Sequence, residues 1–274
     1  MLVNFIDMLK KAQAGHYAVG LFNTIDTDNA QAVIEAAEEM NSPVIIGTAE
    51  ILLPYGELSL IAPSLVSLAK RARVPVVLHY DHGLTFERCM EALQLGFSSI
   101  MYDGSTGDME QNIRDTAQVV RIAHAFGASV EGEIGHVGQA DSDDSCYTTV
   151  SEAVDFAART GVDALAVAIG TAHGNYLKKP VLDLARLSEI RAALDTPLVL
   201  HGGSGLSPEQ FQSTIQNGIA KINIFTELCN VGQAAFVKAT EEGMDYLLAR
   251  NAKVDAIKQT VKQRMALFGC AGKA

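Results

Sequence analysis

Tryptophan is absent from this chain, and basic residues are scarce. The 274 residues include 21 Lys and Arg against 32 Asp and Glu, so the formal net charge is −11. An acidic balance of this size disfavours a nucleic-acid-binding surface and a polybasic membrane patch. No apolar run reaches the roughly 18 residues of a membrane-spanning helix. We therefore expect neither nucleic acid nor a membrane as a partner.

Cysteine is also scarce, and no C-x-x-C pair occurs; the cysteines are Cys89, Cys146, Cys229 and Cys270. With 48% hydrophobic residues, the chain is long enough to bury a core without disulfides. Free thiols then indicate a reducing compartment. The first residues carry their charges after the apolar positions and lack an A-x-A cleavage site, unlike a signal peptide. We predict a cytoplasmic protein.

Low-complexity stretches and Pro/Ser-rich linkers are missing as well, so residues 1–274 are predicted to form a single domain. Short apolar runs rich in β-branched residues recur along it. Most lack polar alternation, which is typical of strands buried on both faces of a parallel sheet. The predicted strands are residues 17–22, 43–47, 75–79, 98–102, 128–133, 164–169, 197–201 and 219–224.

Helical patterns lie between these runs, at residues 29–40, 58–73, 86–95, 110–126, 151–160, 183–194 and 208–217. Strands alternating with helices in this number predict an α/β fold, a (β/α)8 TIM barrel. An open doubly wound sheet is the alternative, but no G-x-G-x-x-G follows the first strand. Residues 226–267 look helical throughout and are predicted to add the eighth helix and additional C-terminal helices.

Histidines gather where the predicted strands end, and a barrel enzyme keeps its active site at those ends. His82, His173 and His201 follow the third, sixth and seventh strands, so they can converge at one mouth of the barrel. Three imidazoles with an open position make a catalytic zinc site, and zinc polarises a carbonyl there. Asp103 and Glu133 are the predicted secondary groups, which orient the imidazoles or hold the ion in an alternative position. His79 is expected to point a different way from His82 and to support the metal site or the fold.

Glycines beside one of these histidines indicate an anion site. Residues 202–205 read GGSG and lie between the seventh strand and a helix that Ser207 and Pro208 would begin. Backbone N–H groups next to a helix N-terminus bind phosphate. Barrels commonly bind phosphate after strands seven and eight. A flexible turn is the alternative interpretation of the same four residues.

A metal ion beside a phosphate site favours an enzyme that acts on a phosphorylated carbonyl compound. Asp81 is adjacent to His82 and is placed to exchange a proton with a substrate oxygen. The polar segment 138–145 is interpreted as a mobile loop that could bring a second carboxylate. A plain solvated acidic loop is the alternative.

Motifs along nearly the whole chain are similar to those of one enzyme family. They are SPVII at residues 42–46, H-x-D-H-G at 79–83, M-x-D-G-S at 101–105, E-x-E-x-G at 131–135, A-x-G-x-x-H-G at 168–174, LHGGSG at 200–205, KINIFTEL at 221–228 and FGCAGKA at 268–274. The chain resembles the class II, zinc-dependent fructose-bisphosphate aldolases, including their tagatose-bisphosphate and related ketose-bisphosphate branches. The resemblance implies reversible cleavage of a ketose (bis)phosphate to dihydroxyacetone phosphate and an aldehyde.

The same resemblance implies roles for individual residues. His82, His173 and His201 would bind Zn²⁺, with Asp103 and Glu133 at secondary metal positions. Asp81 would be the proton donor to the aldehyde oxygen. Dihydroxyacetone phosphate would be held by Gly174, Gly202, Gly203, Ser204, Asn223, Ile224, Phe225 and Thr226. Members are usually homodimers or homotetramers, and many use a monovalent cation near the phosphate.

Three departures from the family pattern lie around the substrate. The loop after E-x-E-x-G reads GQAD at residues 138–141, where the family has G-G and an acidic pair, so Asp141 is the candidate base. Residues 47–51 read GTAEI instead of a Ser-x-Gly turn. Phe225 stands where the fructose branch has Asp and the tagatose branch a small residue. The last two departures lie where the second half of the substrate would bind, so another phosphorylated sugar or sugar acid is an alternative substrate.

Two other functional classes are considered. A metal-dependent hydrolase on this fold would place an H-x-H pair at the end of the first strand, which reads AVGLFN at residues 18–23. A non-catalytic phosphosugar-binding subunit would be expected to have lost a metal ligand or Asp81, yet all are present. An aldol-cleavage assay with and without a chelator separates these readings.

Overall fold

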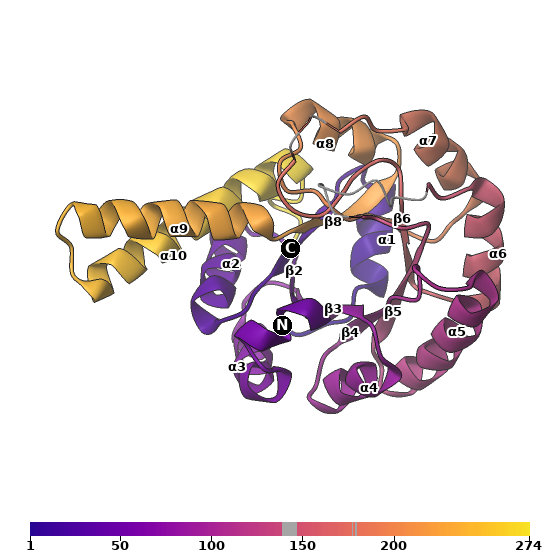
Figure 1. Cartoon of the computed structure of the whole chain (residues 1–274), viewed down its shortest axis with the longest axis horizontal. Coiled ribbons are helices and arrows are strands. Elements are labelled where there is room, and N and C mark those ends of the chain that lie inside the picture. Colours follow the sequence, from indigo (N-terminus) through magenta and orange to yellow (C-terminus); the bar gives the residue numbers. More distant parts are fainter. Residues whose placement is uncertain (139–146, 177, 179) are drawn as a thin grey trace.

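The computed structural model describes residues 1–138, 147–176, 178 and 180–274, and its centre is a barrel of parallel strands (Figure 1). Each strand pairs with the next one along the chain, and β8 closes on β1. The predicted (β/α)8 barrel is thereby confirmed. The strands are β1 Val19–Asn23, β2 Val44–Ala49, β3 Val76–Gly83, β4 Ser99–Tyr102, β5 Ser129–Ile134, β6 Ala164–Val167, β7 Leu198–Leu200 and β8 Ile219–Ile224.

Burial explains why these runs carry few polar residues. All residues of β1, β2, β5, β6, β7 and β8 are buried, because one face fills the barrel and the other packs against helices. The pairing of β2 with β3 runs without interruption from Val44–Val76 to Ala49–Asp81. Sheet hydrogen bonding therefore supports β3 as far as Asp81, at the end where the predicted site begins.

Helices surround the barrel and are α1 Ile6–Ala14, α2 Thr27–Glu39, α3 Leu58–Arg71, α4 Phe86–Gln94, α5 Met109–Ala125, α6 Val150–Thr160, α7 Leu184–Ala193, α8 Pro208–Gln216, α9 Thr226–Glu241 and α10 Tyr246–Phe268, with a 3-10 helix, η1, at Glu50–Tyr55. Side chains at several N-termini fix where the helices begin. Ser207 accepts a hydrogen bond from the Gln210 amide, and the Gln210 side chain accepts one from the Ser207 amide. This capping box confirms the predicted start of α8 at Pro208.

Two elements, α1 and η1, were not predicted. The segment before α1 lies against the N-terminal ends of the strands, where the amide of Val3 donates to Val76 O and the amide of Phe5 donates to Ser129 Oγ. Together with buried Met8 and Leu9 of α1, it covers the end of the barrel opposite the predicted site.

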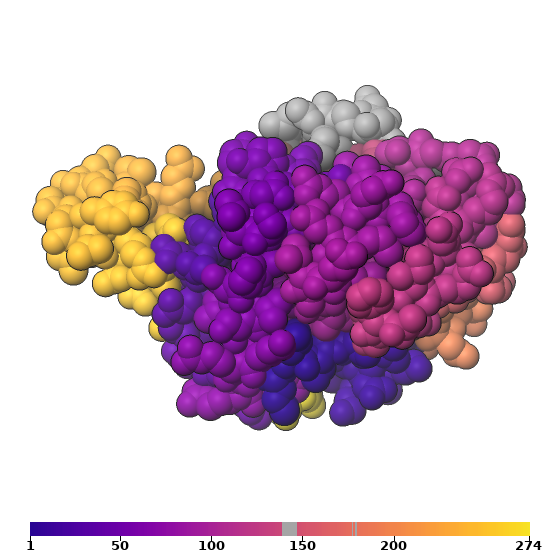
Figure 2. All heavy atoms as spheres, turned by 90° about the horizontal axis from the view of Figure 1, so that it is seen from below, coloured from indigo at the N-terminus to yellow at the C-terminus, as the bar shows by residue number. Residues whose placement is uncertain are grey.

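The C-terminal region forms two helices, which confirms the predicted eighth helix and an additional C-terminal helix. α9 and α10 form a hairpin that extends away from the barrel (Figures 1 and 2), and Gly243 with φ 81° lies in the turn between them. Arg250 of α10 forms a hydrogen-bonded ion pair with Asp28 of α2, which ties the hairpin to the barrel. In the part of the chain that the structure describes, no helix combines the length and apolar character needed to cross a membrane.

Candidate active site

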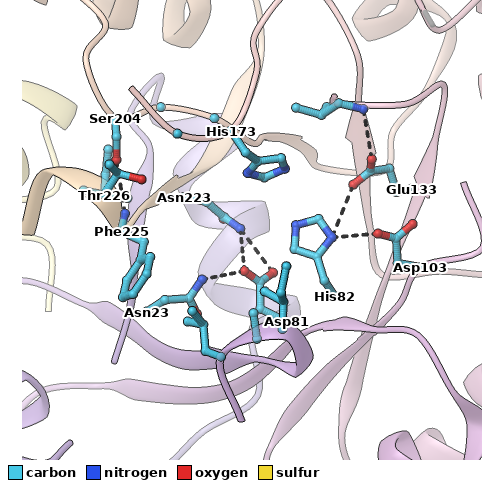
Figure 3. Close-up of a pocket in the computed structure, with 18 of the residues that line it drawn as sticks. Asn23, Asp81, His82, Asp103, Glu133, His173, Ser204, Asn223, Phe225 and Thr226 are labelled. Carbon is cyan, nitrogen blue, oxygen red and sulfur yellow. Dashed lines mark hydrogen bonds and ion pairs between the residues drawn. The ribbon is translucent and has the colours of Figure 1, made fainter. Parts of the chain in front are cut away.

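A cavity of about 430 Å³ opens at the carboxyl ends of the strands. Residues at or after the end of almost every strand line it, including Asn23, Asp81, Asp103, Glu133 and Asn223 (Figure 3). The polar residues at the strand ends therefore meet in one place, as expected for a barrel enzyme.

Three imidazoles lie together in this cavity. One ring nitrogen from each of His82, His173 and His201 lies within 4.8 Å of the others. The Nε2 atom of His82 is 2.8 Å from Nδ1 of His201, and the rings of His82 and His173 are 5.1 Å apart between centroids. The structure thus brings together the three histidines that the sequence singled out.

His82 adopts a backbone conformation that few side chains tolerate. Its φ of 45° is left-handed, and the β3–β4 register shifts between Tyr80 and Gly83. Strained conformations of this kind concentrate at functional sites. The His82 Nδ1 atom is 2.7 Å from Asp103 Oδ2, so its Nε2 atom is the one that faces the other imidazoles.

His201 is oriented by a carboxylate that the sequence reasoning gave no role. Its Nε2 atom is 2.8 Å from Glu131 Oε1, which leaves Nδ1 for the imidazole cluster. The other Glu131 oxygen is 2.8 Å from Lys221 Nζ. All three side chains are completely buried. Lys221 is a charged residue within an otherwise apolar, buried strand. This pattern in the sequence indicates a buried acidic partner, and the sequence prediction did not use it.

The imidazole cluster lies in an acidic environment. Burial lowers the pKa of His82, but Asp81, Asp103 and Glu133 outweigh it and raise that pKa to about 10. Burial and the neighbouring His82 and His201 lower the pKa of His173 to about 3. The surrounding carboxylates therefore stabilise positive charge at the cluster, which is the electrostatic requirement for holding a cation.

The carboxylate of Asp81 is held by two amides. Asn23 Nδ2 donates to Oδ2 at 2.7 Å, and Asn223 Nδ2 lies 3.2 Å from each oxygen (Figure 3). Burial raises the pKa of Asp81, but the positive charge of His82, His201 and Lys221 outweighs it and leaves that pKa well below its usual range. Asp81 is therefore ionised in this structure. Sequence reasoning missed Asn23 as a partner of this carboxylate.

The glycine-rich turn after β7 lies against the start of α9. Ser204 Oγ accepts hydrogen bonds from the amides of Phe225 and Glu227 at 3.2 and 3.3 Å. The hydroxyl proton of Ser204 can therefore be donated to an anion. The amide of Gly203 donates to Asn223 O at 3.2 Å. A Cβ added at Gly203 would lie 2.8 Å from that same oxygen, so glycine is required there by contact with β8.

Comparison with known proteins identifies the family of this chain. Residues 3–273 match the family described as fructose-bisphosphate aldolase class-II. The chain belongs to that family. It is 40% identical to a fructose-bisphosphate aldolase of Thermus caldophilus, with 100% of both chains covered. It is also 40% identical to a 6-phospho-5-dehydro-2-deoxy-D-gluconate aldolase of Halalkalibacterium halodurans, with 100% of this chain and 98% of the relative covered.

A solved structure supports the same family assignment. The crystal structure of the YdjI aldolase from Escherichia coli K12 superposes with a TM-score of 0.92 at 37% identity, covering 100% of both chains. The protein is therefore a class II aldolase, a carbon–carbon lyase of a family that acts on phosphorylated sugars with a divalent metal ion. The hydrolase and the binding-subunit readings are set aside.

The remaining residues predicted for the aldolase site have clear positions. Gly174, Gly202, Ile224 and Thr226 line the same cavity. His79 does not line it: its side chain is completely buried, its Nδ1 atom lies 2.7 Å from Ser99 Oγ, and its Nε2 atom lies 3.7 Å from Asp81 Oδ1. Asp141, the candidate base, lies outside the described residues.

Proposed function

We propose that this chain is a zinc-dependent aldolase that reversibly cleaves a ketose phosphate to dihydroxyacetone phosphate and an aldehyde. The observation that carries the proposal is the convergence of three imidazole nitrogens within 4.8 Å, in the cavity that Asp81 also lines. A phosphorylated sugar acid is the alternative substrate, because a relative that is 40% identical is named for one.

The proposed zinc ligands are His82, His173 and His201. Three imidazoles are a ligand set of catalytic zinc sites. The second nitrogens of His82 and His201 face Asp103 and Glu131, the usual arrangement for orienting metal-bound histidines. Asp103 and Glu133, which cluster with His82, are the proposed secondary position. When bound, the ion would polarise the substrate carbonyl and stabilise negative charge that develops on its oxygen.

The proposed phosphate site lies between the turn after β7 and the N-terminus of α9. Gly174, Gly202, Gly203 and Ser204 form one side, and Asn223, Ile224, Phe225 and Thr226 form the other. Support comes from the position of Ser204 at the N-terminus of α9, where its Oγ atom accepts from the amides of Phe225 and Glu227, since the N-terminus of a helix stabilises an anion. A monovalent cation near the phosphate is part of the same proposal.

Asp81 is the proposed acid and base at the bond that breaks. Because it is ionised, it can accept the proton of the substrate hydroxyl that becomes the aldehyde oxygen. In the reverse direction the protonated carboxyl donates that proton to the aldehyde. The two amides on Asp81 fix its orientation. Proton removal next to the carbonyl is assigned to a second carboxylate, with Asp141 as the candidate.

We further propose that the enzyme is a cytoplasmic homodimer or homotetramer. Exposed Tyr246 and Leu247 at the tip of the α9–α10 hairpin support association, because apolar patches of this kind commonly mark interaction surfaces. Light scattering coupled to size exclusion measures the subunit number. Cys89, Cys229 and Cys270 have no disulfide partner among the described residues, in keeping with a reducing compartment.

The decisive experiment measures aldol cleavage with and without metal. Enzyme loaded with Zn²⁺ should release dihydroxyacetone phosphate from ketose phosphates, detected by its reduction with NADH and a coupling dehydrogenase. Enzyme treated with a chelator should be inactive and recover when Zn²⁺ is restored. Activity that is equal in both preparations would rule out the proposed zinc-dependent mechanism.

A further inference from the structure

The mouth of the cavity carries a set of apolar side chains, one of which, Phe225, also contacts the glycine-rich turn through its backbone amide. Ile51 and Leu52 belong to η1, Leu84 follows β3, and Phe225 follows β8. Ile51 is 70% exposed and Leu84 is 56% exposed, although both line the cavity. Large apolar side chains gathered at the entrance of a pocket indicate a surface that a ligand covers. We refer to these four residues as the apolar rim.

Glu50 fixes two parts of the apolar rim relative to each other. Its Oε2 atom accepts a hydrogen bond from the amide of Leu84 at 2.8 Å and another from the hydroxyl of Tyr80 at 3.1 Å. The segments that carry Ile51 and Leu84 are therefore tied through one carboxylate. The rim is preorganised before any substrate arrives, which lowers the entropic cost of binding.

Apart from its histidines, the charged residues that line the cavity are all acidic. Asp81, Asp103 and Glu133 line it, and the described residues of the lining include no Lys or Arg. Outside the described part, residues 139–146 read QADSDDSC and also contain neither, whereas residue 179 is a lysine. A phosphate or carboxylate next to the apolar rim would thus lose water without gaining a Lys or Arg partner among the residues that the structure describes, which is costly. The proposed phosphate position near Ser204 differs, because it lies at the N-terminus of α9, where the helix dipole favours an anion.

We propose that the apolar rim binds the part of the substrate that becomes the aldehyde, and that this part is uncharged. The substrate is then a ketose 1-phosphate with no second phosphate and no carboxylate at its far end. This inference rests on the proposed aldolase function and specifies its substrate class.

The reaction balances without any further reagent. The bond between C3 and C4 of the ketose breaks, and its electron pair stays on C3. The C4 hydroxyl proton passes to Asp81, and C4 becomes the carbonyl carbon of the uncharged aldehyde. C3 takes up a proton from solvent and Asp81 releases its proton to solvent, so the proton count closes. The product that keeps the phosphate is dihydroxyacetone phosphate.

Two matched pairs of aldehydes test the inference in the condensation direction, with full-length, zinc-loaded enzyme. Glyceraldehyde and glyceraldehyde 3-phosphate differ only in the phosphate, and butanal and succinic semialdehyde differ in a terminal carboxylate. We expect kcat/KM to be at least about tenfold higher for the uncharged member of each pair. A preference for the charged member of either pair would overturn the inference.

A separate measurement distinguishes this inference from the proposed function. Zinc-loaded enzyme should exchange a proton of dihydroxyacetone phosphate with solvent in the absence of any aldehyde. Absence of exchange overturns the proposed function and the inference together. Exchange combined with a preference for charged aldehydes overturns only the inference.

Charge introduced into the apolar rim should change the preference. Ile51→Arg and Leu84→Arg should each shift the kcat/KM ratio at least about tenfold toward glyceraldehyde 3-phosphate, since the phosphate gains a charged partner. Leu60→Arg is the matched control: Leu60 is 77% exposed on α3 and does not line the cavity, so the ratio should stay at the wild-type value. If both rim variants behave like Leu60→Arg, the aldehyde binds elsewhere and the inference is wrong.

Discussion

Lys221 Nζ lies 2.8 Å from Glu131 Oε2 inside the barrel, and neither side chain is exposed to solvent. The same ammonium donates to Asn223 Oδ1 at 2.8 Å, while Glu131 Oε1 faces His201 Nε2. Burial raises the pKa of Glu131, but Lys221 and His201 outweigh it and lower that pKa to about 2. One buried ion pair thus supports a proposed zinc ligand directly and, through Asn223, supports Asp81.

Replacing Lys221 by Met should destabilise the fold strongly. It leaves the charge of Glu131 buried without its partner, which costs about 3–5 kcal/mol. Urea denaturation gives the change in the free energy of unfolding. Lys262→Met removes an ion pair with the exposed Glu39 and should change the free energy of unfolding far less, because solvent screens such a pair. Equal stability of the two variants would contradict a structural role for the buried pair.

Removal of one proposed zinc ligand should remove metal and activity together. His173→Ala leaves two imidazoles, which cannot maintain a three-histidine catalytic site. The measurements are zinc content after dialysis and the rate of aldol cleavage. His124→Ala is the control, because His124 contacts Asp163 on the surface and should keep both properties. Full zinc occupancy with wild-type turnover in His173→Ala would refute the ligand assignment.

Substitution of Gly203 should weaken binding of the ketose phosphate. A Cβ there would lie 2.8 Å from Asn223 O and 2.9 Å from Ile222 Cγ2, so Gly203→Val must displace the turn from the end of β8. We expect KM for the ketose phosphate to rise, because the phosphate donors lose their positions. At Gly107 an added Cβ meets nothing closer than 3.4 Å, so Gly107→Ala should leave KM unchanged. An unchanged KM in Gly203→Val would place the phosphate elsewhere.

The ion pair between Asp28 and Arg250 should make stability depend on pH. Partial burial raises the pKa of Asp28, but hydrogen bonding to Arg250 and the charges of Lys253 and Arg250 lower it overall. A carboxyl whose pKa is lower in the folded state stabilises the fold above its unfolded pKa of about 3.9. That contribution disappears as the pH falls through the folded pKa.

Asp28→Asn should therefore reduce the free energy of unfolding by about 0.5–1 kcal/mol at neutral pH. The difference from the wild type should shrink as the pH falls below about 4. Urea denaturation of both proteins at a series of pH values tests this. A difference that stays constant over the series would show that the lost contact, and not the charge of Asp28, carries the effect.

The barrel and its strand-end histidines could be predicted because their signals are local. Buried strands form continuous apolar runs, and the histidines stand at fixed positions after them. The helix α1 was missed because it spans 9 residues and begins without a side-chain cap. The 3-10 helix η1 was missed because it contains Pro54 and lasts 6 residues, too short for a helical period.

The partners of the site residues could not be predicted in the same way. The contact between Glu131 and Lys221 joins β5 to β8, which are not neighbours in the barrel. It depends on how far each side chain reaches across the interior, and the local sequence does not encode that distance. The same holds for Asn23, which meets Asp81 from β1.

Substitution of Asp81 tests whether this residue handles the proton of the aldehyde oxygen while another carboxylate removes the proton next to the carbonyl. Asp81→Ala should keep zinc and still bind dihydroxyacetone phosphate, because the three histidines and the glycine-rich turn remain. Carbon–carbon cleavage should fall about 10²–10⁴-fold, the usual range for the loss of a positioned acid or base. Proton exchange in dihydroxyacetone phosphate should survive better, since another carboxylate is proposed to remove that proton.

Asp81→Asn is the companion variant, because it has nearly the same size but cannot take up the proton. Equal loss of exchange and cleavage with zinc retained would make Asp81 itself the base that acts next to the carbonyl. Loss of zinc in both variants would instead show that Asp81 supports His82, its neighbour in the chain.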